Sequence, residues 1–168
     1  SIKKSVLAGC TFVKIQKRSP LDLTEDGMLN DKFEKCPAFG SSQLQVRERH
    51  EFTKEEYLEL SNFAERYGAV LFTSVFDISS LEFALDCNCK IIKIASHSNT
   101  NSQLLKEINK NNLPCIMSTG GASIKEIDYA VSLLDNCNLS LMHCVSSYPT
   151  SKDLACLGTI PFLHKRYN

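Results

Sequence analysis

Three short stretches decide the fold of this chain: IIKIASHSNTN at residues 91–101, CIMSTGG at 115–121 and LMHCVSSYPTS at 141–151. Each begins as an apolar, strand-like run and ends abruptly in hydroxyl or amide side chains. Lys93 lies inside the first apolar run, and Lys14 lies inside a similar run, FVKIQK, at residues 12–17. Because a charge in a buried strand is costly unless it is paired, these features together predict a pocket for a small anion.

Strands and helices alternate along the chain. Segments rich in Val, Ile, Leu, Phe and Met, with little strict alternation, predict buried parallel strands. These strands are expected at residues 11–16, 69–74, 90–95, 114–118 and 139–144. Capping signals predict the helices. Thr53 with Glu56 begins a helix that ends at Gly68, Asp77 begins one that reaches about Leu85, Asn101 or Ser102 begins one that reaches about Lys110, and Ser123 with Glu126 begins another.

The repeated strand–helix order predicts a parallel α/β fold with right-handed crossovers. It fits either part of a (β/α)8 barrel or a doubly wound open sheet. An open sheet would normally carry a glycine-rich first turn, whereas the first turn here is QKRSPLD, residues 16–22. Polar residues follow every strand, which is typical of barrel sites. Since a full barrel takes about 250 residues, the 168 residues predict an incomplete one.

Composition excludes several classes of protein. Hydrophobic residues make up 43% and charged residues 23% of the chain, as expected for one soluble globular domain. The formal net charge is zero, which argues against a nucleic-acid partner. No apolar run approaches the roughly 18 residues of a membrane span, and SIKKSVLAGC lacks the apolar core of a signal peptide. We therefore expect a cytoplasmic protein without a membrane partner, and the absence of an initial Met predicts a piece of a longer chain.

The eight cysteines do not follow a disulfide pattern. Cys115 and Cys144 lie in or at the end of strand-like runs and Cys10 lies beside another, where cysteine behaves as a small hydrophobe. Cys87 and Cys89 form a single close pair, with no second pair to complete a zinc site. We expect reduced structural thiols, with a metal or redox role as the alternative.

Residues 17–52 form one long connection of mixed charge without a sustained period. A connection of this length is usually functional or disordered. It is expected either to close over the pocket or to lie on the surface.

Five motifs, in their order and spacing, carry a family resemblance: VKIQK at 13–17, LFTSVFD at 71–77, KIASHSNTN at 93–101, PCIMSTGGAS at 114–123 and HCVSSYP at 143–149. Together they resemble the sialic acid (N-acetylneuraminate) synthases. The resemblance implies that residues 1–168 form one incomplete TIM-type barrel. The family's N-terminal strand, its last strands and its C-terminal antifreeze-like domain are then missing, and residues 17–52 correspond to a variable insertion.

The resemblance also implies a reaction, the condensation of phosphoenolpyruvate with N-acetylmannosamine or a related amino sugar in sialic acid biosynthesis. A divalent metal, Mn or Mg, would polarise the aldehyde of the sugar. The family's metal ligands lie in an S-D-H-T-like segment and a later histidine that this sequence does not contain. No residue here is therefore expected to bind the metal, and the chain by itself is expected to be inactive. Full-length members are expected to form homodimers.

Eight positions match the family's functional residues. Lys14 and Lys93 are expected to be catalytic and to bind phosphoenolpyruvate, together with the hydroxyls of Ser74, Ser96, Ser118 and Ser146, while Gln16 and Tyr148 are expected to face the amino sugar. Gly120 and Gly121 allow close approach of an anion to the backbone. Structural roles remain the alternatives: Lys14 at a strand edge reaching water, Lys93 in an ion pair, Ser74 and Asn101 as helix caps, and His143 as a structural histidine.

One position departs from the family. Its acidic residue after the K-I-A-S motif corresponds to Ser98, and serine cannot replace a carboxylate as a base. This departure keeps two alternatives open. The chain is either a non-catalytic anion-binding or assembly module, as a degenerate paralogue or half of a split barrel, or a synthase for another sugar acid such as legionaminic or pseudaminic acid.

Overall fold

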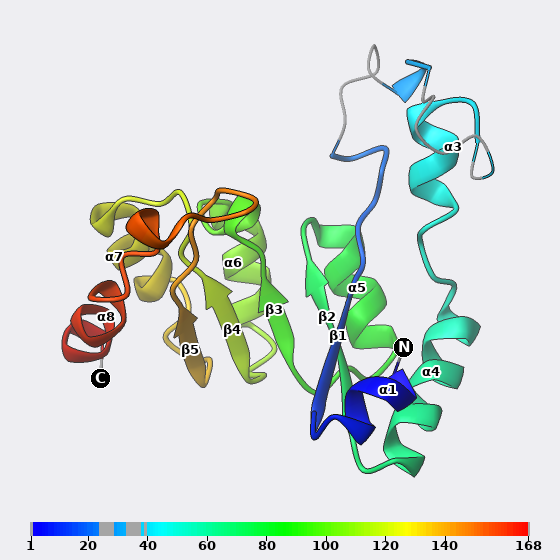
Figure 1. Cartoon of the computed structure of the whole chain (residues 1–168), viewed down its shortest axis with the longest axis horizontal. Helices are drawn as coiled ribbons and strands as arrows, with labels where there is room; N and C mark the ends of the chain where they lie inside the picture. Colours follow the sequence, from blue (N-terminus) through cyan, green and yellow to red (C-terminus); the bar gives the residue numbers. More distant parts are fainter. Residues whose placement is uncertain (1, 24–28, 33–37, 39, 168) are drawn as a thin grey trace. The chain divides into compact units, whose positions relative to one another are not determined.

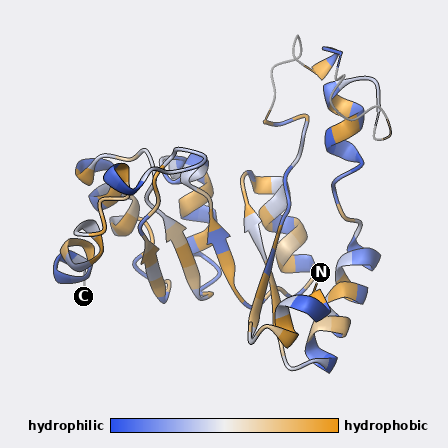
Figure 2. Ribbon diagram, viewed as in Figure 1, coloured by the Kyte–Doolittle hydropathy of each residue, from blue (hydrophilic) through white to orange (hydrophobic). Residues whose placement is uncertain are grey.

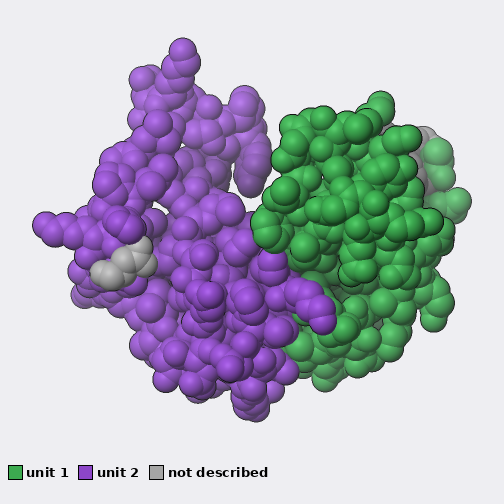
Figure 3. Space-filling view, turned by 90° about the horizontal axis from the view of Figure 1, so that it is seen from below, with its two compact units in different colours: residues 1–89 green, residues 90–168 purple. Residues whose placement is uncertain are grey.

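The computed structural model describes residues 2–23, 29–32, 38 and 40–167. The chain divides into two compact units, Ser1–Cys89 and Lys90–Asn168. Figure 3 colours the first unit green and the second purple. Every described strand pairing within these units is parallel.

The first unit is built around a pair of parallel strands. Its elements are α1 (Ile2–Leu7), β1 (Phe12–Gln16), α3 (Gln43–Glu48), α4 (Lys54–Arg66), β2 (Val70–Val75) and α5 (Ile78–Asp86) (Figure 1). Lys14 pairs with Phe72 and Gln16 with Ser74, so these four residues share one face of the two strands. Helices α4 and α5 contact β2.

Local capping explains where α4 begins. The hydroxyl of Thr53 accepts a hydrogen bond from the Glu56 N–H at 3.2 Å, and the Glu56 carboxylate accepts one from the Thr53 N–H at 2.9 Å. This reciprocal pair satisfies two N–H groups at the helix start. Hydrophobic and hydrophilic residues alternate along α4 (Figure 2), and Tyr57 and Ala64 form its buried side. The helix ends just before Gly68, whose φ of +75° suits glycine.

The second unit contains three parallel strands in the order β3, β4, β5. Its elements are β3 (Ile92–Ile94), the 3-10 helix η2 (Ser96–Ser98), α6 (Ser102–Asn109), β4 (Cys115–Ser118), α7 (Ile124–Ser132), β5 (Leu139–Met142), the 3-10 helix η3 (Lys152–Leu154) and α8 (Thr159–Tyr167). In the described part of the chain, β5 pairs with β4 and with no other strand.

The two faces of β3 and β4 differ in chemistry. Ile92, Ile94, Cys115 and Met117 are buried on one face. Because successive strand residues point to opposite faces, Lys93, Ile116 and Ser118 lie together on the other, and the register pairs Lys93 with Ile116. The apolar face, together with the buried side chains of α6 and α7, forms the core of this unit. The sheet therefore holds Lys93 on the face opposite the core.

Helix α8 is attached to α7 by a cluster of polar side chains. Arg166 donates to both carboxylate oxygens of Asp128, through Nε at 2.9 Å and Nη2 at 2.7 Å. The Tyr167 hydroxyl donates to the same carboxylate at 2.8 Å. Leu163 is the buried residue of α8. The last described helix of the chain is thus fixed by one bidentate ion pair and one apolar anchor.

The strands and capped helices predicted from the sequence are confirmed, with shifts of one or two residues at their ends. Among the α-helices whose bounds the structure describes, α1, α3 and α8 were not predicted. The long connection expected at residues 17–52 contains α3, which Ser42 caps by accepting from the Gln45 N–H at 3.3 Å. Helices α1 and α3 are only six residues long, and α8 carries Pro161 in its first turn, where proline is tolerated. Residues 24–28, 33–37 and 39 of the connection lie outside the described residues.

The described cysteines are free thiols. Cys87, Cys89 and Cys115 are buried, and burial raises the pKa of the Cys115 thiol. Cys10 is exposed because it lies in the turn before β1, so it does not behave as the packed hydrophobe expected from the sequence. Among the helices of the described ranges, none has the length and apolar character needed to cross a membrane.

Candidate functional site

Lys93 is the centre of the polar face of the second unit. Its Nζ donates a hydrogen bond to the Ser118 Oγ at 2.8 Å. The lysine is half-buried, and within the described part of the chain no carboxylate forms an ion pair with it. The alternative of a structural ion pair is therefore not observed there. A half-buried ammonium with a neutral partner is suited to bind an anion.

Two further hydroxyls converge on Gly120. A Cβ at this position would lie 2.8 Å from the Ser96 Oγ and 3.0 Å from the Ser146 Oγ, so only glycine fits without a shift. Ser96 begins η2 after β3, Gly120 follows β4, and Ser146 follows β5. The ends of three successive strands thus place the Ser96 and Ser146 hydroxyls beside Gly120, which follows Ser118 by two residues. Because Gly120 has no side chain, only its backbone lies beside these two hydroxyls.

The turn after β4 is held from two sides. Asn99 donates from Nδ2 to the carbonyl oxygens of Ser118 at 3.1 Å and Gly120 at 3.4 Å, and its side chain is buried. Thr119 donates to the Met142 carbonyl oxygen from both its N–H, at 3.0 Å, and its hydroxyl, at 3.1 Å. Sequence reasoning missed Asn99. The only sign of Asn99 in the sequence is that an amide residue follows SHS, residues 96–98. Asn101, two residues later, is an equally good candidate by that criterion.

Other predicted residues of this unit lie apart from the cluster or have structural roles. Tyr148 is 96% exposed and precedes Pro149 through a cis peptide bond. Asn101 caps α6, accepting from the Leu104 N–H at 3.1 Å. The Nε2 of His143 lies 2.8 Å from the Ala155 carbonyl oxygen, which agrees with a structural histidine. Ser98 is buried, and its hydroxyl lies 3.4 Å from the His97 Nδ1.

Three predicted residues belong to the first unit. Lys14 and Gln16 are exposed on β1 and lie on the same face as Ser74 of β2, which is 1% exposed. The Lys14 Nζ donates to the Ile15 carbonyl oxygen at 3.3 Å. Ser74 is not the cap of α5, because the Ser80 N–H donates to the Asp77 carboxylate at 2.6 Å instead. The three side chains therefore share a face within their own unit.

A divalent metal, which the family resemblance implies, finds no ligand set in the ranges that the structure describes. No group of three or more His, Cys, Asp or Glu side chains there is placed to hold a metal ion. The hydroxyl-rich cluster around Lys93 also lacks the carboxylate oxygens that Mg²⁺ and Mn²⁺ prefer. The described residues therefore do not fit this metal.

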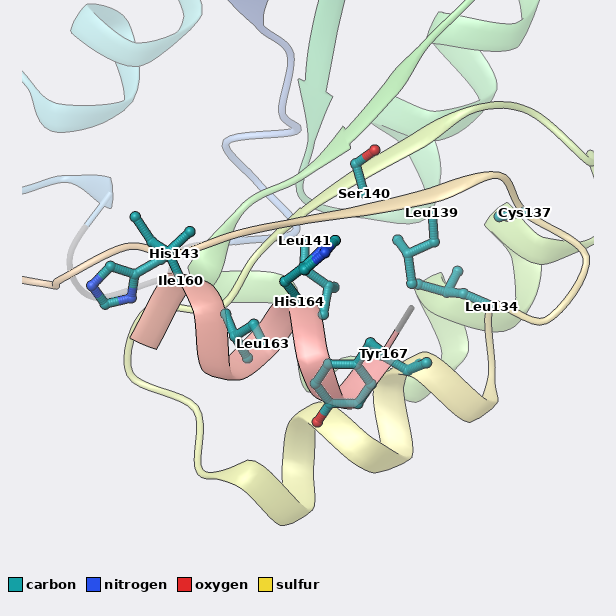
Figure 4. Close-up of a pocket in the computed structure, with 11 residues that line it drawn as sticks. Leu134, Cys137, Leu139, Ser140, Leu141, His143, Ile160, Leu163, His164 and Tyr167 are labelled. Carbon is teal, nitrogen blue, oxygen red and sulfur yellow. The ribbon is translucent and has the colours of Figure 1, made fainter. Parts of the chain in front are cut away.

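A separate cavity of about 510 Å³ lies between β5, α7 and α8 (Figure 4). Aliphatic side chains such as Leu139, Leu141 and Ile160 line it together with polar groups, among them the imidazoles of His143 and His164. None of the residues predicted to bind phosphoenolpyruvate lines it. Its mixed polar and apolar lining shares no residue with the Lys93–Ser118 pair.

The chain is similar in sequence and in structure to known sugar-acid synthases. N-acetylneuraminate-9-phosphate synthase of Drosophila melanogaster is 34% identical to it, over 95% of this chain and 44% of that protein. N,N'-diacetyllegionaminic acid synthase of Campylobacter jejuni is 31% identical, over 84% of this chain and 44% of that protein. The crystal structure of N-acetylneuraminic acid (sialic acid) synthetase from Leptospira borgpetersenii in complex with citrate matches with a TM-score of 0.81 and 29% identity, over 99% of this chain and 54% of that one.

The chain thus spans about half the length of the curated relatives that it matches. The structural likeness confirms the predicted fold class, an α/β fold of the (β/α)8 barrel type that is incomplete in these residues. The family model described as the NeuB family matches residues 1–168. The order of the five motifs, the parallel strands and these matches agree, and the chain belongs to the NeuB family.

Proposed function

We propose that the second unit binds phosphoenolpyruvate and that the protein serves its condensation with an N-acetylated amino sugar. The observation that carries this proposal is the half-buried Lys93, hydrogen-bonded to Ser118 at 2.8 Å. Phosphoenolpyruvate carries a carboxylate and a phosphate, and both accept strong hydrogen bonds from ammonium and hydroxyl donors. Ser96 and Ser146 supply two more hydroxyls beside Gly120.

In the proposed reaction, C3 of phosphoenolpyruvate forms a bond to the aldehyde carbon of the sugar. The aldehyde C=O bond opens and its oxygen takes up a proton, water adds at C2 and loses a proton, and the C2–O bond to the phosphate breaks, which releases inorganic phosphate. Lys93 holds a fixed positive charge beside the anionic groups while charge redistributes. The hydroxyls of Ser96, Ser118 and Ser146 orient the same groups, so the ligand is bound in one geometry before reaction.

The family resemblance extends the proposal to other residues. Lys14 and Ser74 are proposed as further phosphoenolpyruvate ligands, and Gln16 and Tyr148 as contacts to the amino sugar. Shared exposure of Lys14 and Gln16 on one face of β1 supports their accessibility to a ligand. The second substrate is proposed as N-acetylmannosamine, its phosphate, or a precursor of legionaminic acid, since relatives are named as synthases of such products.

Binding of phosphoenolpyruvate to the 168-residue chain tests the proposal. Titration followed by nuclear magnetic resonance should show saturable shifts of the Gly120 and Gly121 amides and of the Lys93 side chain. An equal concentration of chloride salt controls for ionic strength. Unchanged spectra at millimolar phosphoenolpyruvate, with the chain folded, would overturn the proposal.

The 168-residue polypeptide assayed by itself is proposed to be inactive in condensation. By the family resemblance, Ser98 stands where the family carries an acidic residue; it is 2% exposed, and its hydroxyl lies beside His97. A serine hydroxyl does not serve as a base near neutral pH. A rate of phosphate release above the background, dependent on both phosphoenolpyruvate and N-acetylmannosamine in the presence of manganese, would contradict this prediction.

The burial of Ser98 also favours a second candidate, a phosphoenolpyruvate-binding or assembly module without catalysis. This module is either a degenerate paralogue that only binds, or half of a split barrel in which another chain supplies the acid–base group. Mixing with a polypeptide that carries the S-D-H-T-like segment of a relative discriminates the two candidates. Activity in the mixture alone supports the split arrangement, whereas inactivity in every mixture leaves binding as the sole function.

A further inference from the structure

We propose that Asn99 is a positioning residue for the anion site. Its side-chain amide holds the turn at residues 118–120 in the conformation that presents the Ser118 hydroxyl and the Gly120 backbone to the ligand. This inference rests on the proposed function of the second unit as a phosphoenolpyruvate site. The hydrogen bonds of the Asn99 amide group to this turn end on backbone carbonyl oxygens.

The geometry of the amide matches its two acceptors. Nδ2 donates to the Ser118 carbonyl oxygen at 3.1 Å and to the Gly120 carbonyl oxygen at 3.4 Å. An asparagine NH₂ group carries two hydrogens, so one side chain satisfies both carbonyls. Asn99 is only 4% exposed, and water therefore has little access to replace it. A buried amide with both hydrogens used fixes the spacing of the two carbonyls.

The turn is anchored from its other side by Thr119. Both the N–H and the hydroxyl of Thr119 donate to the Met142 carbonyl oxygen, at 3.0 and 3.1 Å. Thr119 thus ties the turn to β5, while Asn99 ties it to the segment that follows β3. With both anchors in place, the Ser118 hydroxyl lies 2.8 Å from the Lys93 Nζ.

The same turn sets the environment of Gly120. The position of a Cβ at Gly120 lies 2.8 Å from the Ser96 Oγ and 3.0 Å from the Ser146 Oγ. A small rotation of the turn would therefore move Gly120 relative to both hydroxyls as well as Ser118 relative to Lys93. Removing the amide donor should weaken ligand binding even though the donor does not touch the ligand, because these groups share one backbone segment.

The variant Asn99→Leu tests the inference, since leucine has the same branched skeleton at Cγ, no hydrogen-bond donor and no charge that could itself repel an anion. Asn109→Leu is the matched control. The Asn109 amide donates to Asp135 at 2.7 Å and its carbonyl oxygen accepts from the Asn136 N–H at 2.9 Å, so it joins the end of α6 to the loop before β5. Each variant removes an asparagine that links two segments of the second unit. Of these two asparagines, only Asn99 holds the turn at residues 118–120.

The dissociation constant for phosphoenolpyruvate, measured by calorimetry, is the readout. Asn99→Leu should raise it by roughly tenfold or more, the change that loss of a buried hydrogen bond corresponds to, whereas Asn109→Leu should leave it unchanged. Equal affinity in Asn99→Leu and the unaltered chain would overturn the positioning role while leaving the proposed function in place. Absence of binding in the unaltered chain would overturn the proposed function itself, and the inference with it.

A second measurement needs no variant and therefore covers the case in which Asn99→Leu does not fold. In the unaltered chain, the side-chain amide protons of Asn99 should exchange slowly with solvent and shift when phosphoenolpyruvate binds. Those of Asn109, an exposed hydrogen bond, should not shift. Rapid exchange of the Asn99 amide, or no shift on ligand binding, would contradict the proposal.

Discussion

The Nζ of Lys93 donates a hydrogen bond to the Oγ of Ser118 at 2.8 Å, from β3 to the adjacent strand β4. The parallel register pairs Lys93 with Ile116, so Ser118 lies two residues further along the neighbouring strand on the same face. Sequence position alone separates these residues by 25 places. The sheet brings them together, and the hydroxyl of Ser118 satisfies one of the three ammonium hydrogens while leaving the others for an anion.

Alanine at Gly120 should weaken binding of phosphoenolpyruvate. Its Cβ would lie 2.8 Å from the Ser96 Oγ and 3.0 Å from the Ser146 Oγ, and the backbone of Gly120 does not lie in the positive-φ region, so the contact is the obstacle. We expect a dissociation constant raised about tenfold and a loss of stability of about 1–3 kcal/mol from overpacking. Calorimetry and urea denaturation measure the two effects.

Gly158→Ala is the control for this experiment. A Cβ at Gly158 meets no heavy atom within 4 Å, and this glycine also lies outside the positive-φ region. Alanine there should leave binding unchanged and should maintain or slightly raise stability, since it restricts the unfolded chain. If Gly120→Ala and Gly158→Ala bind phosphoenolpyruvate equally well, the hydroxyls beside Gly120 do not contact the ligand.

Glu51 should stabilise the first unit through its carboxylate. The carboxylate accepts from the Arg18 N–H and the Arg18 Nε, both at 3.1 Å, and lies 3.4 Å from the Lys17 Nζ. Its side chain is 11% exposed, against 33% for that of Arg18. Glu51→Gln keeps the shape but removes the charge, and we expect a loss of about 1–2 kcal/mol, reduced by solvent around Arg18.

Urea denaturation of the 168-residue chain measures this loss, with Glu48→Gln as the matched control. Glu48 is exposed on α3, so its replacement should change stability by less than about 0.5 kcal/mol. Equal stability of the two variants would show that the ion pairs of Glu51 contribute nothing beyond those of an exposed glutamate.

Attachment of α8 should depend on pH through Asp128. Hydrogen bonds from Arg166 and then Tyr167 lower the pKa of Asp128 from its ordinary value of 3.8. A carboxyl whose pKa is lower in the folded state contributes stability above its unfolded pKa, and this contribution is lost as the pH falls through the folded pKa. The contribution is therefore complete at neutral pH and disappears in acid below the ordinary value.

Hydrogen exchange of the α8 amides, measured in parallel for the unaltered chain and Asp128→Asn, tests this dependence. The variant should show faster exchange at neutral pH and a smaller change on acidification. The difference between the proteins should be modest and should shrink in high salt, because Arg166 and Asp128 are both exposed. An identical pH profile for α8 in both proteins would rule out the Asp128 contacts as the attachment.

Local signals explain which parts of the fold were predictable. The caps formed by Thr53 and Ser123, each with a glutamate three residues on, act within one helical turn and are visible in the sequence. Helix α8 lacks such a cap and depends instead on Arg166 reaching Asp128 on α7, 38 residues earlier. Contacts at that separation leave no local pattern, so this helix was not predicted.

The residues of the candidate site also divide into those that the sequence indicates and those that only the structure reveals. Lys93 could be singled out from the sequence because a charge between isoleucines in a buried strand is costly unless a partner binds it. Ser118 could be singled out because it ends the next strand. Asn99 was not, since its two acceptors are backbone carbonyls on another strand end. Tyr148, predicted to face the sugar, is 96% exposed, and its role stays a prediction.

The affinity of Lys93→Met for phosphoenolpyruvate tests the central claim most directly. Methionine fills the same half-buried space without the ammonium, so folding should be preserved. Lys125→Met, which removes the same charge from an exposed position on α7, is the matched control. We predict a dissociation constant raised at least about 100-fold in Lys93→Met, as expected for loss of a charge-assisted contact, and unchanged in Lys125→Met. Equal affinity in the two folded variants would contradict the assignment of this site to phosphoenolpyruvate.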